Sequence, residues 1–159
     1  MLILLLMSFT MILGLVDIVI KFYVEGNIAR GEKCEIMNGK VEIRKEYNEG
    51  FALNIMDERP QDVRVASAFT AVFLTIYQCL TLLRKKHFGR KLGLSLMVAG
   101  AWSNTFDRWV HKYVIDYIGF KTKSDKVNRL TFNLGDFYII LGGGFILLSV
   151  LFHKVCRKK

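Results

Sequence analysis

The chain has 159 residues, which suits a single domain, and its formal net charge is +9. A soluble domain with that charge would suggest a nucleic-acid partner, but 52% of the residues are hydrophobic and the charges lie between long apolar runs. That arrangement is typical of a polytopic membrane protein. Since no RNA- or DNA-binding motif is present, we attribute the basic excess to membrane orientation and anionic lipid.

The first apolar run, "MLILLLMSFTMILGLVDIVI", holds a single charged residue, Asp17. It lacks both the basic start and the small-residue cleavage site of a secretory signal peptide, so we expect a retained membrane helix over residues 2–21. Asp17 and Lys21 are one helical turn apart and can form an ion pair.

A polar loop from Glu25 to Asp62 follows, with nine acidic residues and six Lys/Arg. Within it, "NG" at positions 38–39 separates short stretches that contain β-branched residues. This pattern predicts a small β-hairpin, which we expect to rest on the membrane surface.

Three further membrane helices are predicted over residues 64–84, 91–110 and 133–153. The link "RKKHFGRK" carries five Lys/Arg and the tail "HKVCRKK" carries four, with no acid in either. By the positive-inside rule both lie in the cytoplasm, and the acidic first loop lies outside.

The predicted fold class is therefore an all-α membrane protein with four transmembrane helices, both termini cytoplasmic. It has a small extracytoplasmic β element in the first outer loop, and residues 1–159 form a single domain.

Three acidic residues are predicted to share one depth in the membrane. From the rise per residue of a helix, Asp17, Asp107 and Asp136 lie roughly 22 to 25 Å from the inner face of a core about 30 Å thick. Ionisable residues at such depth mark a functional site by default, and Asn104 and Asn133 adjoin them. A purely structural polar girdle is the alternative. Depth alone makes Asp107 the natural partner of Asp136.

The residue types favour one chemistry over others. The three histidines are scattered, which argues against a zinc site, and Ser103 has no His or Lys partner at helical spacing. What remains is carboxylates and carboxamides. Two carboxylates that share one proton can act as general base and general acid, which is the chemistry of aspartyl peptide hydrolysis.

Four ordered blocks then carry a family resemblance over nearly the whole chain: D-x-x-x-K at Asp17 and Lys21, "NEGFALN", "AGAWSNTFDR" followed by "VID", and "FNLGD". On these blocks the chain resembles bacterial lipoprotein signal peptidase, also called signal peptidase II. It departs from the family pattern at Leu53, at Ala99 and Ser103, where the pattern has glycine, and at Gly135, where it has alanine.

The resemblance implies that the catalytic pair is Asp116 and Asp136, so that Asp107 becomes a supporting residue. To bring Asp116 back over Asp136, the segment "WVHKYVIDYIGF" must bend and lie at the membrane surface, with its aromatic residues at the interface. The residues implied to bind substrate or support the pair are Asp17, Lys21, Asn48, Gly50, Asn104, Asp107, Arg108 and Asn133.

The implied activity is that of an aspartic endopeptidase of the bacterial cytoplasmic membrane. It would remove the signal peptide from lipid-modified prolipoproteins, before the diacylglyceryl-cysteine, at the extracytoplasmic face. The expected partners are that substrate and membrane lipids, with no metal, cofactor or nucleic acid. A catalytically inactive binding or assembly protein on the same scaffold is the main alternative, and a small transporter or channel is a third.

Overall fold

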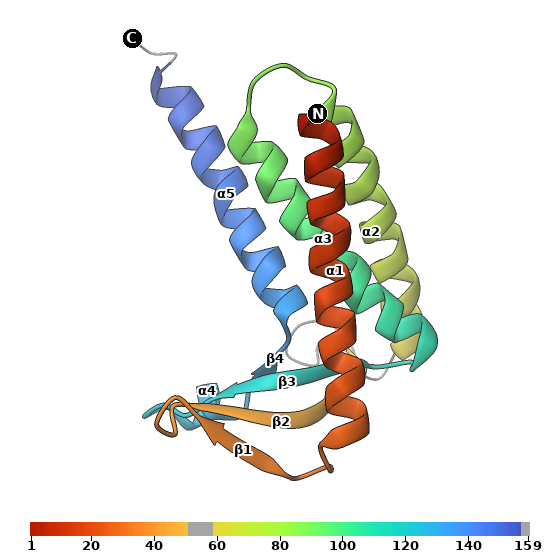
Figure 1. Ribbon diagram of the computed structural model, residues 1–159, viewed down its shortest axis with the longest axis vertical. Helices are drawn as coiled ribbons and strands as arrows, with labels where there is room; N and C mark the ends of the chain where they lie inside the picture. Colours follow the sequence, from red (N-terminus) through yellow and green to blue (C-terminus); the bar gives the residue numbers. More distant parts are fainter. Residues whose placement is uncertain (51–58, 157–159) are drawn as a thin grey trace.

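The computed structural model describes residues 1–50 and 59–156, with side chains up to residue 152. In chain order the elements are α1 (Leu2–Asn27), β1 (Lys33–Ile36), β2 (Val41–Asn48), α2 (Pro60–Leu82), α3 (Phe88–Val110), β3 (Val114–Phe120), α4 (Asp125–Asn128), β4 (Thr131–Phe132) and α5 (Leu134–Cys156). Four long helices form a bundle, and the strands form one sheet across one end of it (Figure 1). The N-terminus and the last turns of α5 lie at the opposite end.

Among the described residues, three helices are long and apolar enough to cross a membrane: Leu2–Asn27, Pro60–Leu82 and Leu134–Phe152. Their large apolar side chains point outward, with Leu4 70% and Phe69 73% exposed, as expected where lipid is the solvent. Three of the predicted membrane helices are thereby confirmed as helices of sufficient length and hydrophobicity, with shifted ends. The first continues to Asn27, six residues beyond its predicted end, and the second begins at Pro60, a residue suited to the first helical turn.

The remaining long helix, α3, lies in the middle of the bundle. It packs against α1, α2 and α5, and it buries polar residues such as Ser95, Asn104 and Asp107. A helix that three others surround needs few lipid-facing apolar residues, which explains why α3 is less hydrophobic than its neighbours. That α3 is the fourth membrane span, and that both termini are cytoplasmic, stay predictions.

Glycines allow α3 and α5 to approach closely. A Cβ added at Gly142 would lie 2.5 Å from the carbonyl oxygen of Gly93, and one added at Gly100 would overlap the carbonyl oxygen of Gly135. Gly142 therefore serves the close packing of the two helices. Gly143 and Gly144 do not, since a Cβ added at either meets no atom within 4 Å.

The sheet has the order β1-β2-β3-β4, and each pair of neighbours is antiparallel. The predicted hairpin is confirmed as β1 and β2, whose turn carries positive φ angles at Met37, Asn38 and Gly39. However, the β element is not confined to the first outer loop, because β3 and β4 come from the segment after α3. The β-rich "VIDYIGF" pairs with the open edge of β2 and so satisfies its backbone groups.

The segment after α3 turns back as predicted, and residues 114–120 form a strand that packs against α1. Its place at the membrane surface stays a prediction. Lys112 has φ 74, and the chain reverses there into β3. Ile115 and Tyr117 are 0% and 3% exposed, and they pack against Val24 in the last turns of α1. Trp109, by contrast, is 56% exposed. The additional turns of α1 thus provide the surface on which the sheet packs.

The close contact between α3 and α5 predicts different outcomes for two adjacent glycines. Gly142→Ala places a methyl group against the backbone of α3 and should lower the free energy of unfolding by about 1–3 kcal/mol. Gly143→Ala is the matched control, and it should be neutral or stabilising by up to about 1 kcal/mol, since alanine favours the helix. Unfolding of both variants in the same detergent micelles measures the difference. Equal stability of the two variants would contradict the close contact.

Candidate functional site

A capping box positions Asp136 at the start of α5. Asn133 precedes the helix, and its Oδ1 accepts the backbone N–H of Asp136 at 2.9 Å. In return, Asp136 Oδ2 accepts the backbone N–H of Asn133 at 3.1 Å. This reciprocal arrangement satisfies two backbone donors that a helix start otherwise leaves unpaired. It holds the carboxylate of Asp136 in the first turn, where the helix dipole favours negative charge.

Asp17 of α1 supplies a second cap to the same helix end. Its carboxylate accepts the backbone N–H of Leu134 at 3.2 Å and that of Gly135 at 3.1 Å. The hydroxyl of Tyr117 donates to Asp17 Oδ1 at 2.9 Å and accepts from the Leu134 N–H at 3.2 Å. Burial raises the pKa of Tyr117, so its hydroxyl stays a donor. Elements α1, β3 and α5 are thereby joined at one point.

Strand β3 carries Asp116, which lies opposite Glu46 in the register of β2 and β3. Asp116 is 4% exposed. Each of its carboxylate oxygens accepts one carboxamide N–H. Asn133 Nδ2 donates to Oδ1 at 2.6 Å, and Asn48 Nδ2 donates to Oδ2 at 3.2 Å. Asn48 is itself oriented by the backbone N–H of Gly50, which donates to its Oδ1 at 3.1 Å.

Helix α3 contributes an asparagine to the other carboxylate. Asn104 Nδ2 donates to Asp136 Oδ1 at 3.0 Å. One turn further on, Arg108 donates to the carbonyl oxygens of Gly50 at 2.7 Å and of Asn104 at 3.3 Å. The guanidinium therefore ties the loop after β2 to α3.

Beneath these residues, the buried ammonium of Lys21 contacts two carboxylates. It lies 3.2 Å from Asp17 Oδ2 and 3.1 Å from Asp107 Oδ2, and it donates to Asn104 Oδ1 at 2.7 Å. Asp107 Oδ2 also accepts the backbone N–H of Ile115 at 3.0 Å. Asp107 thus faces Lys21 and does not line the pocket with Asp136, contrary to the depth-based pairing.

Lys21 also contacts Ser103, which helical spacing alone could not predict. No lysine lies at helical spacing from Ser103, but Lys21 reaches it from α1 and donates to its Oγ at 3.2 Å. Ser103 in turn donates to Asp17 Oδ2 at 2.6 Å, is fully buried and does not line the pocket. Its surroundings therefore fit a structural hydroxyl and not a nucleophile.

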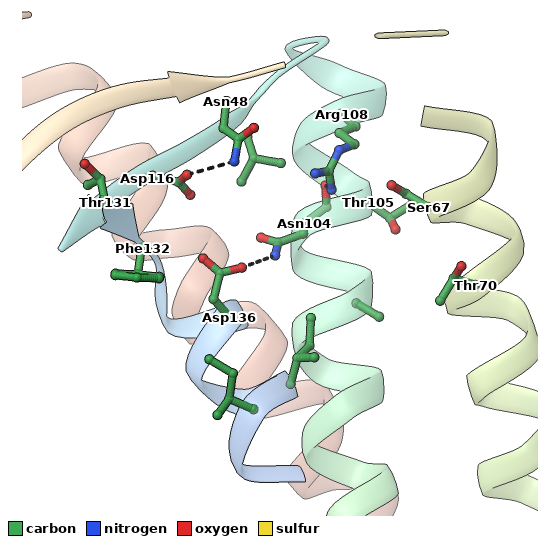
Figure 2. A pocket seen from close by; sticks show the side chains of 14 residues that line it. Asn48, Ser67, Thr70, Asn104, Thr105, Arg108, Asp116, Thr131, Phe132 and Asp136 are labelled. Atoms are coloured by element: carbon green, nitrogen blue, oxygen red, sulfur yellow. Dashed lines mark hydrogen bonds between the residues drawn. The ribbon is translucent and has the colours of Figure 1, made fainter. Parts of the chain in front are cut away.

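Asp116 and Asp136 line one pocket of about 350 Å³ at the sheet end of the bundle. Figure 2 shows both carboxylates directed into it, with Asn48 and Asn104 beside them. Strands β2 to β4 and helices α2, α3 and α5 contribute to its walls. Within residues 1–50 and 59–152, no group of three His, Cys, Asp or Glu side chains could hold a metal ion.

The environment of Asp116 changes its titration. Burial raises the pKa of Asp116 to about 7, and the negative charge of Asp136 acts in the same direction. The N–H groups of Asn48 and Asn133 act in the opposite direction, because they stabilise the ionised form. Asp116 can therefore hold or release a proton near neutral pH, whereas an ordinary aspartate cannot.

The structure brings every predicted site residue to this end of the bundle, in the pocket or in the network beneath it: Asp17, Lys21, Asn48, Gly50, Asn104, Asp107, Arg108, Asp116, Asn133 and Asp136. Ala52 and Leu53 of the second block lie outside the described residues. Sequence reasoning missed Tyr117, which it assigned to the membrane interface. Strand alternation was the available signal, since it turns Tyr117 to the face opposite Asp116.

The fold and the site together define a membrane protein of mostly helical structure. At the end that the sheet covers, two carboxylates that accept hydrogen bonds from carboxamides line one pocket. The family model for signal peptidase (SPase) II, peptidase A8, matches residues 9–152. The chain therefore belongs to the signal peptidase II family, and it is a protease of the bacterial membrane.

Relatives agree with this assignment, and solved structures share the fold. Lipoprotein signal peptidases of Brucella ovis and Brucella canis are each 29% identical over 135 residues, which cover 85% of this chain and 82% of theirs. Two bacterial membrane enzyme structures, determined by the in meso method at 2.3 and 1.9 Å, match with TM-scores of 0.82 and 0.76 at 19% identity. The matches cover 97% and 92% of this chain and 91% and 92% of theirs, and they show the shared fold.

The buried ion pairs predict that Lys21→Met is strongly destabilising. Two buried carboxylates would lose their common counter-ion, at a cost of about 3–5 kcal/mol in the free energy of unfolding. The control is Lys121→Met, because Lys121 is 55% exposed in its pair with Glu35, so its loss should leave the stability nearly unchanged. Chemical unfolding in detergent compares the variants. A Lys21→Met protein as stable as the control would contradict the role assigned to the ammonium.

Proposed function

We propose that this protein removes signal peptides from lipid-modified prolipoproteins by aspartyl catalysis, cleaving the bond before the diacylglyceryl-cysteine. The observation that carries the proposal is the pair Asp116 and Asp136, which line one pocket and are each held by carboxamide donors. Membership of the signal peptidase II family and the names of the Brucella relatives support the substrate.

The place of the pocket suits a substrate whose lipid stays in the bilayer. Its walls include Ile139 and Ile140 of α5 and Thr70 of α2, and Ile140 is 62% exposed on the side of the bundle. A peptide can therefore occupy the polar end near the sheet while acyl chains lie along the apolar side. A substrate with a peptide and acyl chains requires a site at the membrane edge, because the peptide then stays near water and the acyl chains stay in lipid.

We infer that the sheet end faces away from the cytoplasm. The basic link between α2 and α3, "RKKHFGRK", lies at the end of the bundle opposite the sheet, and the N-terminus and the last turns of α5 lie there as well. The positive-inside rule assigns that end to the cytoplasm. With α3 as the fourth span, the protein is multi-pass and its catalytic pair lies at the extracytoplasmic face.

The first step uses the two carboxylates in different protonation states. Asp136, ionised at the helix start, takes a proton from water while the water oxygen bonds to the scissile carbonyl carbon. Asp116, with its pKa raised to about 7, enters the step protonated and gives its proton to the carbonyl oxygen. A neutral gem-diol results, and Asp116 becomes the ionised partner.

In the second step the C–N bond breaks. The departing nitrogen takes the proton from Asp136, while Asp116 recovers a proton from a diol hydroxyl. The products are the carboxyl end of the signal peptide and the free amine of the lipid-modified cysteine, and both carboxylates return to their starting states. Asn48, Asn104 and Asn133 keep the carboxylates oriented throughout, which lowers the entropic cost of the reaction.

The proposal predicts that Asp116→Asn and Asp136→Asn each reduce cleavage of a lipid-modified prolipoprotein by at least about 10³-fold, since neither amide can exchange the required proton. Asp125→Asn, at the exposed start of α4, is the matched control and should cleave at the wild-type rate. A gel-shift assay in detergent measures the rates, and thermal unfolding shows that the variants are folded. Cleavage at the wild-type rate by either variant would refute the pair. Failure of the wild-type chain to cleave would favour the inactive binding protein.

The raised pKa of Asp116 predicts a descending limb in the pH profile of kcat/KM. Because the protonated form is the active one, the rate should fall as the pH rises through about 7. Asn48→Ala removes an N–H that stabilises ionised Asp116, so the pKa should rise and the limb should move to higher pH. Initial cleavage rates between pH 5 and pH 9, about two units either side of that value, test both statements. A limb that stays in place in Asn48→Ala would contradict the assignment of that limb to Asp116.

A further inference from the structure

We propose that Ser103 and Gly135 form a coupled pair that sets the position of Asp17 and, through it, of the catalytic Asp136. The effect on catalysis, but not the contact between the two residues and Asp17, rests on the proposed function. Both residues contact the same carboxylate oxygen, Asp17 Oδ2, from different helices. Neither is a catalytic residue, because neither lines the pocket. Both are positioning residues.

Ser103 holds that oxygen firmly. Its hydroxyl donates to Asp17 Oδ2 at 2.6 Å, the length expected of a strong, charge-assisted bond from an O–H donor to a carboxylate. The side chain is fully buried, and it also accepts a hydrogen bond from Lys21 at 3.2 Å. The hydroxyl therefore has both a donor and an acceptor role, and its removal would leave Asp17 with one partner fewer in a site that water does not reach.

Gly135 has no space for a side chain while Asp17 is held there. A Cβ added at Gly135 would lie 2.9 Å from Asp17 Oδ2 and 3.0 Å from Asn133 Oδ1. The distance to Asp17 Oδ2 is shorter than real Cβ atoms show, so the carboxylate of Asp17 or the first turn of α5 would have to move. Asn133 is fully buried and holds Asp116, which makes its movement costly as well.

The coupling follows because Ser103 limits how far the oxygen can retreat. Asp17 Oδ2 already accepts from Ser103 at 2.6 Å, from the Gly135 N–H at 3.1 Å and from Lys21 at 3.2 Å. A hydroxyl oxygen at 2.6 Å cannot come closer. With glycine at position 103 the hydroxyl oxygen is absent. The carboxylate of Asp17 then gains room to move away from a methyl group at position 135.

This coupling explains two departures from the family pattern as one change. That pattern has glycine at the position of Ser103 and alanine at the position of Gly135, so the larger residue lies on α5 and the smaller on α3. Here the sizes are exchanged across Asp17 Oδ2. A chain that carries both Ser103 and a methyl group at position 135 would crowd Asp17 Oδ2.

The consequence for catalysis runs through the helix start. Asp17 caps the N–H groups of Leu134 and Gly135, and Asp136 follows directly in the same turn. A displaced cap moves the carboxylate of Asp136 relative to Asp116, whereas most of the pocket wall that contacts substrate stays in place. We therefore expect a change in kcat with little change in KM, since small misplacement of a reacting group slows the chemical step.

The test compares Gly135→Ala, Ser103→Gly and the double variant with the wild type. For the cleavage of a lipid-modified prolipoprotein, Gly135→Ala should lower kcat by about 10²-fold with KM within about threefold. The double variant should recover kcat to within about threefold of Ser103→Gly. Gly143→Ala, which meets no neighbouring atom, is the control for an added methyl group in α5.

Thermal unfolding in detergent provides the second measurement and does not depend on the proposed function. The loss of Tm caused by Gly135→Ala should be smaller in the Ser103→Gly background than in the wild type. If Gly135→Ala does not fold, recovery of folded protein in the double variant supports the coupling. Equal losses of Tm in both backgrounds, or a Gly135→Ala protein that behaves as the control, overturn it. A wild-type chain that does not cleave refutes the proposed function, while the Tm comparison still decides the coupling.

Discussion

The ammonium of Lys21 is the interaction on which the rest of the site depends. It lies buried between Asp17 and Asp107, and it also contacts Ser103 and Asn104. A charge in such surroundings is tolerated only when its partners are close, so these contacts fix α1 against α3 in one register. Asp17 then extends the connection to α5, because its carboxylate caps that helix. One lysine therefore aligns three helices at the level of the candidate site.

Each carboxylate of the candidate pair is oriented by carboxamides. Asn104 donates to Asp136, Asn48 donates to Asp116, and Asn133 bridges the two by capping one and donating to the other. A carboxamide offers a donor and an acceptor in fixed geometry without adding charge. Lysine or arginine in these places would favour two ionised aspartates, whereas neutral donors let burial keep the pKa of Asp116 near 7.

The sheet and the bundle depend on each other. The last turns of α1 form a small core with Ile115 and Tyr117 of β3, and the same strand presents Asp116 on its other face. Buried packing on one side therefore sets the height and orientation of the carboxylate on the other. This explains why a helix longer than the membrane requires is useful here, since its extension is the platform for the strand.

The sequence by itself determined the apolar spans, all four long helices, the hairpin, and the set of polar residues that gather at one end, because hydrophobic runs, turn residues and short motifs are local features of the chain. It did not determine which of those residues touch. The depth argument paired Asp107 with Asp136, and the family resemblance replaced Asp107 with Asp116. The reversal after α3 gives the physical reason, because it brings Asp116 to the pocket and leaves Asp107 on Lys21. The lysine contact of Ser103, the strand formed by residues 114–120 and the cap by Asp17 likewise join segments far apart in sequence. Such contacts depend on how helices and strands pack, and local periodicity contains no information about that.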